Sequence, residues 1–210
     1  MITGDAKSQP ALGFLTILEH EGHGFVGGYL ILNMVGRPLE FHCTAPLKPN
    51  RAQQILFGPT LESYLYGEQI GQTLLAKCSL ELLAVCTDVE RALCVRDHVS
   101  LPVALVISDQ QEPSPSILPS PAMDSGELSQ ARQGPGVRVD AWRVDAAHRV
   151  GPHLHQFAVG RNRLAVPLHR ESDQHSIAER LANLATFDLA EPFSRIREAV
   201  EEAHKVARAY

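Results

Sequence analysis

The sequence has no long apolar run, and this absence excludes a protein with a membrane-spanning helix. No apolar stretch reaches the ~20 residues that such a helix needs. The first residues also lack the basic segment followed by an apolar segment that marks a secretory signal. Hydrophobic residues make up 44% and charged residues 20% of the 210 residues, as in ordinary globular proteins. We therefore expect a cytoplasmic protein with no membrane partner.

Cysteine is scarce, and its spacing excludes a motif of the C-x-x-C type. The four cysteines are Cys43, Cys78, Cys86 and Cys94. In a chain without a secretion signal we expect these thiols to be reduced. A reduced thiol within an apolar segment behaves as a small hydrophobic side chain, so we assign the cysteines to packing.

An excess of positive charge is also missing. The formal net charge is -5 and the isoelectric point is about 6.0, whereas binding to phosphate backbones needs a positive surface. Six arginines gather in the C-terminal third, but acidic residues alternate with them, which favours a mixed solvated surface. These arginines are Arg138, Arg143, Arg149, Arg161, Arg163 and Arg170. We therefore do not expect a nucleic-acid partner.

No complete catalytic motif is present. The chain lacks the G-x-S-x-G nucleophile elbow and the G-x-x-x-x-G-K-[ST] phosphate loop. Gly22, Gly24, Gly27 and Gly28 fall within an expected hairpin, not between a strand and a helix as in a phosphate-binding loop. We therefore predict no catalytic residue and no cofactor.

Three short apolar strands open the predicted fold. Glycines near residues 21–24 favour a tight reversal after the first strand, and Asn33 with Gly36 favours a second turn. Pro38 begins the third strand, and because proline cannot donate to a ladder, we expect this strand at an edge of the sheet. The strands are predicted over residues 14–18, 25–32 and 38–44. Together they form an antiparallel meander.

Two helices and a crossover are predicted next. Asn50 and Gln53 form a capping-box pair for a helix that ends near Phe57. Thr60 is expected to cap a second helix through residue 75, in which Gly67 and Gly71 share a face that a neighbouring backbone could approach closely. Apolar strands over residues 82–86 and 101–107 then flank a short helix from Asp88 to Cys94. This order predicts a β-α-β unit with parallel strands.

Pro, Ser and Gly predominate from residue 110 to 136, which predicts a disordered insertion. After it, residues 137–142 alternate like a strand, and residues 154–159 and 163–166 form a second hairpin signal. Ser176 and Glu179 resemble a capping box for a helix through residue 184. A final helix carries Pro192 in its first turn and an apolar stripe of Phe193, Ile196, Val200, Ala203 and Ala207.

We therefore predict an α+β fold with a mixed sheet. Its parts are the antiparallel three-stranded meander, the β-α-β unit, the second hairpin and two C-terminal helices. Residues 1–109 form the α+β core, residues 110–136 the disordered insertion, and residues 137–210 the strands and helices that complete the same domain.

Histidine is frequent, with 10 copies, and raises the alternative of a metal site. His153 and His155 are two residues apart, so on a strand both would point to one face and could share zinc or manganese. His20 and His23 lie close to Glu19, although their spacing differs from the H-E-x-x-H motif. The alternative hypothesis is a metal-dependent hydrolase or nuclease-like enzyme that uses these histidines with carboxylates.

The segment GRPLEFHCTAPLKPN from Gly36 to Asn50, continued by LFGPTLE from Leu56 to Glu62, resembles a family of bacterial proteins of unassigned function. The resemblance covers roughly residues 14–75 and implies no activity. A meander whose turn reads Asn-x-x-Gly-x-Pro, followed by a helix, also looks like the opening of small α+β sensor or scaffold domains of the profilin-like and roadblock types. This is a likeness of fold, which does not fix function.

Without a catalytic motif, the sequence favours a non-catalytic protein-interaction module, an accessory subunit of a bacterial multi-protein assembly. The amphipathic last helix, the expected edge at Pro38 and the Pro/Ser-rich segment are typical of chains that bind a protein partner or form homo-oligomers. Four polar residues where the third strand passes into the first helix are the predicted binding residues. They are Arg37, Glu40, His42 and Asn50.

Overall fold

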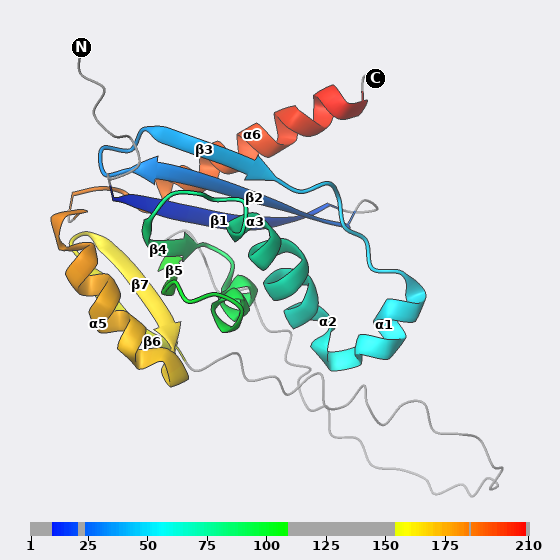
Figure 1. Ribbon diagram of the computed structural model, residues 1–210, viewed down its shortest axis with the longest axis horizontal. Coiled ribbons are helices and arrows are strands. Elements are labelled where there is room, and N and C mark those ends of the chain that lie inside the picture. The colour runs from blue at the N-terminus through cyan, green and yellow to red at the C-terminus, as the bar shows by residue number, and fades with distance from the viewer. Residues whose placement is uncertain (1–9, 21–23, 109–153, 185, 209–210) are drawn as a thin grey trace, which may run out of the picture. The chain divides into compact units, whose positions relative to one another are not determined.

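The computed structural model describes residues 10–20, 24–108, 154–184 and 186–208. Seven strands of these residues form one mixed sheet in the order β3-β2-β1-β4-β5-β7-β6, with helices beside it (Figure 1). The predicted α+β class is confirmed. The strands are β1 Ala11–His20, β2 Gly24–Asn33, β3 Pro38–Cys43, β4 Leu82–Thr87, β5 Val103–Ile107, β6 Leu154–Val159 and β7 Asn162–Pro167.

The helical segments are of three kinds. The α-helices are α1 Arg51–Phe57, α2 Leu61–Ser63, α3 Thr73–Leu75, α5 Glu171–Arg180 and α6 Glu191–Arg208. The 3₁₀ turns are η1 Gly58–Thr60, η3 Glu90–Asp97, η5 Leu168–Arg170 and η6 Ala182–Leu184, and η2 Tyr64–Gln72 is a π-helix.

The predicted meander is confirmed. β1 pairs antiparallel with β2, β2 pairs antiparallel with β3, and β3 is the last strand at one end of the sheet. Gly36 makes the second turn with a φ of 80°, a conformation that favours glycine. Pro38 therefore stands at an edge, as its missing N–H requires.

The parallel strands of the predicted β-α-β unit are confirmed, but the helix between them differs in type and in its start. β4 pairs parallel with both β1 and β5. The connection η3 is a 3₁₀-helix that follows Val89 in an extended conformation, without a side-chain cap. The predicted cap, Asp88, instead pairs with Arg197 of α6, so its carboxylate joins two elements distant in sequence.

The first helix is confirmed, and the second is different from the prediction. Asn50 and Gln53 exchange both hydrogen bonds of the capping box, and α1 ends at Gly58. Thr60 does not cap a new helix, because its hydroxyl donates to the Phe57 carbonyl at 2.8 Å. The chain instead continues through η1 and α2 into the π-helix η2 and then α3.

The two glycines of η2 have close neighbours, but these are side chains near η3, not the neighbouring backbone that the sequence predicted. A Cβ on Gly67 would lie 3.0 Å from the His98 ring and 3.2 Å from the Cys94 sulfur. A Cβ on Gly71 would lie 2.6 Å from a methyl group of Val95. Helix η3 therefore packs directly on the backbone of η2.

The second hairpin is confirmed, because β6 and β7 pair antiparallel around Gly160. The start of the next helix is not as predicted: α5 begins at Glu171, and Ser176 lies inside it. An ion pair holds the first turn of α5, since Arg96 Nε lies 2.6 Å from Asp173 Oδ2 and Arg96 Nη2 lies 3.1 Å from Asp173 Oδ1. Such a contact between distant segments leaves no local pattern in the sequence.

The final helix begins with Pro192 in its first turn, as predicted. Its stripe is buried at Phe193, Ile196 and Val200, but Ala203 is exposed, which corrects the predicted length of the stripe. The side chain of Ala207 lies outside the described part of α6.

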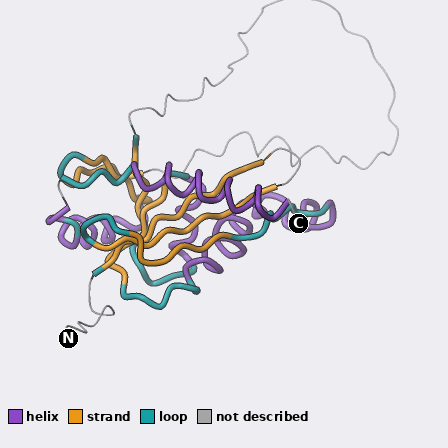
Figure 2. The backbone as a smooth tube through the Cα atoms, turned by 90° about the horizontal axis from the view of Figure 1, so that it is seen from above, coloured by secondary structure: helices purple, strands orange, loops and turns teal. Residues whose placement is uncertain are grey.

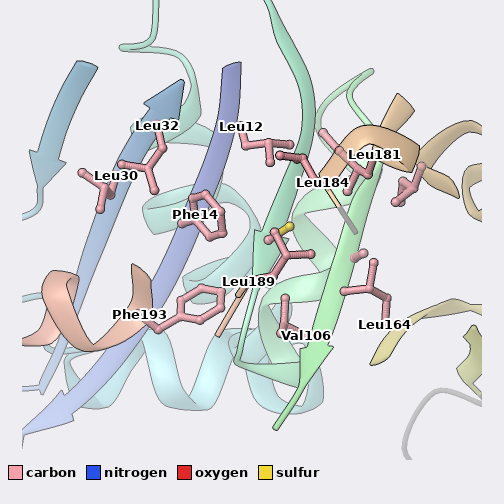
Figure 3. Close-up of a cluster of buried hydrophobic side chains, with 14 of the residues drawn as sticks. Leu12, Phe14, Leu30, Leu32, Val106, Leu164, Leu181, Leu184, Leu189 and Phe193 are labelled. Atoms are coloured by element: carbon pink, nitrogen blue, oxygen red, sulfur yellow. The ribbon is translucent and has the colours of Figure 1, made fainter. Parts of the chain in front are cut away.

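Helices lie on both sides of the sheet (Figure 2). On one side α5 and α6 bury one apolar cluster, in which the rings of Phe14 and Phe193 meet edge to face at 5.7 Å (Figure 3). On the other side η2, α3 and η3 bury a second cluster that includes Tyr29, Ile70 and Leu74. The two faces of the sheet therefore pack against two separate hydrophobic cores.

Adjacent glycines on β2 let both helical layers approach the sheet. A Cβ on Gly27 would collide with Ile70 and Leu74, and a Cβ on Gly28 would collide with Ile196 and Val200. The described residues up to 108 and from 154 onward belong to one compact unit. The predicted insertion over residues 110–136 and the predicted strand over residues 137–142 lie outside the described residues.

Candidate functional site

A polar cluster lies at the edge strand β3 and contains two of the four predicted binding residues. Glu40 and His42 are two residues apart on β3, so their side chains share one face. Glu40 Oε2 lies 3.0 Å from His42 Nε2, and both side chains are about three-quarters buried. The Ser79 hydroxyl donates to Glu40 Oε1 at 3.3 Å. The Glu40 carboxylate therefore lies between an imidazole and a hydroxyl.

Tyr29 lies on the same face of the sheet, directly opposite His42 on the neighbouring strand. Its side chain is fully buried, and its ring passes over Gly13, where a Cβ would collide with the hydroxyl. This hydroxyl is buried without a hydrogen-bond partner. Burial, followed by nearby Cys78 and Glu40, raises the pKa of Tyr29 above its ordinary value. Tyr29 is therefore a neutral phenol.

The cluster does not have the geometry of an activated nucleophile. In a Ser-His-acid triad the imidazole lies between the hydroxyl and the carboxylate, whereas here the Glu40 carboxylate occupies the middle position. Burial raises the pKa of the neighbouring Cys78 thiol, and a thiol must ionise to act as a nucleophile. Burial also raises the pKa of Cys86 to about 12 and of Cys94 to about 11.

The other two predicted binding residues have separate positions. Arg37 is exposed in the turn before β3, where its backbone N–H donates to Asn33 Oδ1 at 2.9 Å. Asn50 caps α1 and accepts from the Gln53 N–H at 2.8 Å. The structure therefore brings Glu40 and His42 together and places Arg37 and Asn50 at a turn and a helix start.

The predicted metal ligands fall mostly outside the described residues. This holds for His23, for His153 and for the side chain of His20. His155 is half-buried on β6, which forms the opposite edge of the sheet from His42 on β3. No group of three metal-ligating side chains is found among the residues that the structure describes.

The arginines of the C-terminal third are described only in part, because Arg138, Arg143 and Arg149 lie outside the described ranges. Two of the others pair with acids: Arg161 lies 3.1 Å from Asp188, and Arg170 lies 2.9 Å from Asp97. Each of these two arginines is therefore paired with a carboxylate from another segment of the chain.

A second candidate site is the exposed apolar face of α1, which sequence reasoning missed. Ala52, Ile55 and Leu56 have the spacing i, i+3, i+4 and form one helical face, which we call the α1 surface. Ile55 is 66% exposed and Leu56 is 83% exposed, and no residue of α1 is buried. In Figure 1, α1 stands away from the sheet.

The end of α1 is anchored although its apolar face is open. The ring of Phe57 stacks on Tyr64 with centroids 4.0 Å apart and an interplanar angle of 21°. The capping box closes the other end of the helix. The sequence limits α1 at Gly58-Pro59, but whether its apolar face is covered depends on packing that no local spacing reveals.

The segment of sequence that contains α1 is positively charged, with Glu40 and Glu62 directly outside it. Between Phe41 and Leu61 the only residues with a fixed charge are Lys48 and Arg51, and no carboxylate occurs. This segment is therefore locally positive in a chain whose net charge is -5.

Comparison of the chain with family models, curated proteins and solved structures gives no match. Within the described ranges, no helix combines the length and the apolar character needed to cross a membrane.

Proposed function

We propose that this protein is a non-catalytic interaction module, an accessory subunit that binds another protein by placing α1 in an apolar groove of that partner. The observation that carries the proposal is a helix with a complete capping box whose Ile55 and Leu56 are largely exposed. Amphipathic helices that dock into grooves present anchors at this spacing.

The energetics support a helix that is preformed for binding. A free helix shorter than about 12–15 residues is marginal in water, yet α1 has only seven residues and is held by its cap and by the Phe57–Tyr64 stack. Transfer of a large aliphatic side chain out of water is worth about 1.5–3 kcal/mol. Because the helix is already formed, a smaller loss of backbone conformational entropy opposes binding.

Charge specifies the chemistry of the partner. Arg51 is the first residue of α1, and no acid occurs from Arg51 to Leu61. An apolar groove with an acidic rim is therefore complementary to α1. Rim charges act mainly on the association rate, so association should slow as the salt concentration rises.

Site-specific photo-crosslinking in the native cells tests the proposal. A photoreactive residue replaces Leu56 in one variant and Leu168, which is 50% exposed in η5, in a matched control variant. We expect a discrete protein adduct from position 56 and none of the same mass from position 168. Against the purified adduct partner, Ile55→Ser should weaken binding by about tenfold, and Arg51→Glu should slow association at low salt.

Three outcomes would contradict the proposal. One is the absence of an adduct at position 56, and a second is the same set of adducts at both positions. The third is a lipid partner: co-sedimentation of the purified protein with phosphatidylserine vesicles, lost in Ile55→Ser, would make α1 a membrane-surface helix.

A further inference from the structure

The outer side of β3 presents backbone groups that β2 does not use. The Thr44 N–H donates to the Gly27 carbonyl at 3.0 Å, so in this antiparallel ladder His42 and Glu40 direct their backbone groups to β2. The alternate residue Phe41 then directs its N–H and C=O away from β2. Within the described sheet, β3 has a neighbour on one side only.

Apolar side chains lie along the same edge. Phe41 is 38% exposed and Leu39 is 41% exposed. Phe41 pairs with Leu30, which packs in the cluster that α6 covers, so the Phe41 ring lies on the α6 side of the sheet. Exposed apolar residues, beside backbone N–H and C=O groups that no neighbouring strand binds, favour the addition of another strand.

We propose that two copies of this chain associate through β3, pairing antiparallel with Phe41 opposite Phe41 of the second copy. The two sheets then join at their β3 edges into one sheet. This surface is separate from the α1 surface and does not depend on the function proposed for α1.

Two-fold symmetry and charge select this register. In a symmetric antiparallel pair of strands, the two-fold axis lies between the two copies of one residue, which we call the central residue. The exposed segment allows Glu40, Phe41 or His42 to be the central residue. Centring on Glu40 sets two carboxylates opposite each other, and centring on His42 sets two imidazoles opposite each other. Centring on Phe41 sets Glu40 opposite His42 of the second copy twice, which is the complementary arrangement.

The length of β3 limits the strength of the dimer. The pairing of β2 with β3 shifts between Ile31 and Leu32, so regular strand geometry ends near Glu40. With Phe41 opposite Phe41, Cys43 and Thr44 would face Leu39 and Pro38 of the second copy, where β3 is irregular. Regular pairing therefore covers only Glu40 to His42 and buries less than the roughly 800 Å² per partner of a standard interface. Additional contact is available on the α6 side, because the last turns of α6 project past β3 in Figure 1. We therefore expect a dimer that dissociates on dilution.

Disulfide trapping between two different variants tests the register. Opposite residues of a non-hydrogen-bonded pair have Cα atoms about 4.5 Å apart, within the range that a disulfide spans. Glu40→Cys and His42→Cys are prepared separately in a Cys43→Ser background and mixed under mild oxidation. We expect a covalent dimer in the mixture at about tenfold the yield of either variant alone, and none when Leu168→Cys replaces one component.

Sedimentation velocity of the unaltered chain gives the second measurement. We expect a monomer–dimer equilibrium that Phe41→Lys shifts to the monomer and Ile55→Ser leaves unchanged. His42→Glu should weaken the dimer by about tenfold, and the exchanged pair Glu40→His with His42→Glu should restore it. A monomer at every concentration, or equal disulfide yields from the mixed and unmixed variants, would overturn the proposal.

Discussion

At the scale of single residues, the least usual feature is the buried Tyr29 hydroxyl. It lies over Gly13, on the face of the sheet that also carries Glu40 and His42, and has no hydrogen-bond partner among the described residues. A buried polar group without a partner destabilises the folded state by about 1–3 kcal/mol, because it loses its hydrogen bonds to water and forms none within the protein. The hydroxyl therefore destabilises the fold that its ring helps to pack.

Replacing Tyr29 by Phe removes this hydroxyl and keeps the ring. We expect the free energy of unfolding to rise by about 1 kcal/mol, measured by urea denaturation. Tyr66→Phe is the matched control, since Tyr66 is also buried but its hydroxyl bonds to Arg91. That control should lose stability, so a loss of similar size in Tyr29→Phe would show that the Tyr29 hydroxyl has a partner.

The raised pKa of Tyr29 gives the same variant a pH signature. An unfolded tyrosine ionises near 10, while the folded residue keeps its proton to higher pH. Above pH 10 the unfolded state thus binds fewer protons than the folded state, and stability falls as the pH rises. The alkaline loss of stability should be smaller in Tyr29→Phe, and identical curves for both proteins would contradict this assignment.

Part of the β3 cluster could be predicted from sequence. Alternation along a strand is a local rule, so Glu40 and His42 could be placed on one face. Ser79 and Tyr29 were missed because their positions depend on the loop after α3 and on strand register. The hydrogen bond between Ser79 and Glu40 joins residues 39 positions apart, for which no spacing rule exists.

At the scale of elements, α1 is a helix whose stability is local. None of its residues is buried, so its cap and its terminal stack hold it instead of a core. Most helices of globular proteins depend on tertiary packing of an apolar face. This difference makes α1 separable from the rest of the fold.

Asn50→Ala tests this separation. Loss of a helix cap costs about 1 kcal/mol, but here the cost should fall on α1 alone. We expect faster amide hydrogen exchange over residues 51–57 and an unchanged Tm. A fall in Tm with unchanged exchange in α1 would show instead that the helix unfolds only together with the core.

Several elements were predicted from local signals, but the local cap signals at Thr60, Asp88 and Ser176 gave wrong helix starts. The β1–β3 meander, the cap of α1 and Pro192 of α6 follow from neighbouring residues. The start of α5 depends on the pair Arg96–Asp173, which joins residues 77 positions apart. Ser176 and Glu179 have the spacing of a capping box, but this pattern cannot reveal that a helix has already begun.

At the scale of the whole molecule, the sheet separates two cores, one of which packs on Gly27 and the other on Gly28. The class of the fold followed from the sequence, because alternation and turn residues define strands locally. The strand order did not, because β1–β4 and β5–β7 pair segments far apart in the chain. The separate domain boundaries at residues 110 and 136 stay predictions.

Alanine at each of these glycines tests the two layers independently. Gly27→Ala should disturb η2 and α3, and Gly28→Ala should disturb α6, since the added methyl group collides with each layer in turn. Each change should cost about 1–3 kcal/mol in the free energy of unfolding. Hydrogen exchange should rise over residues 64–75 in the first variant and over residues 191–208 in the second. The same exchange pattern in both would contradict independent layers.

The paired glycines also bear on ancestry. Any descendant chain that keeps both helical layers on this sheet must keep residues 27 and 28 without side chains. Ile55 and Leu56 are largely exposed, so they can change without altering either core. In distant homologues, the Gly-Gly pair of the second strand should therefore be conserved more strongly than the apolar face of the first helix.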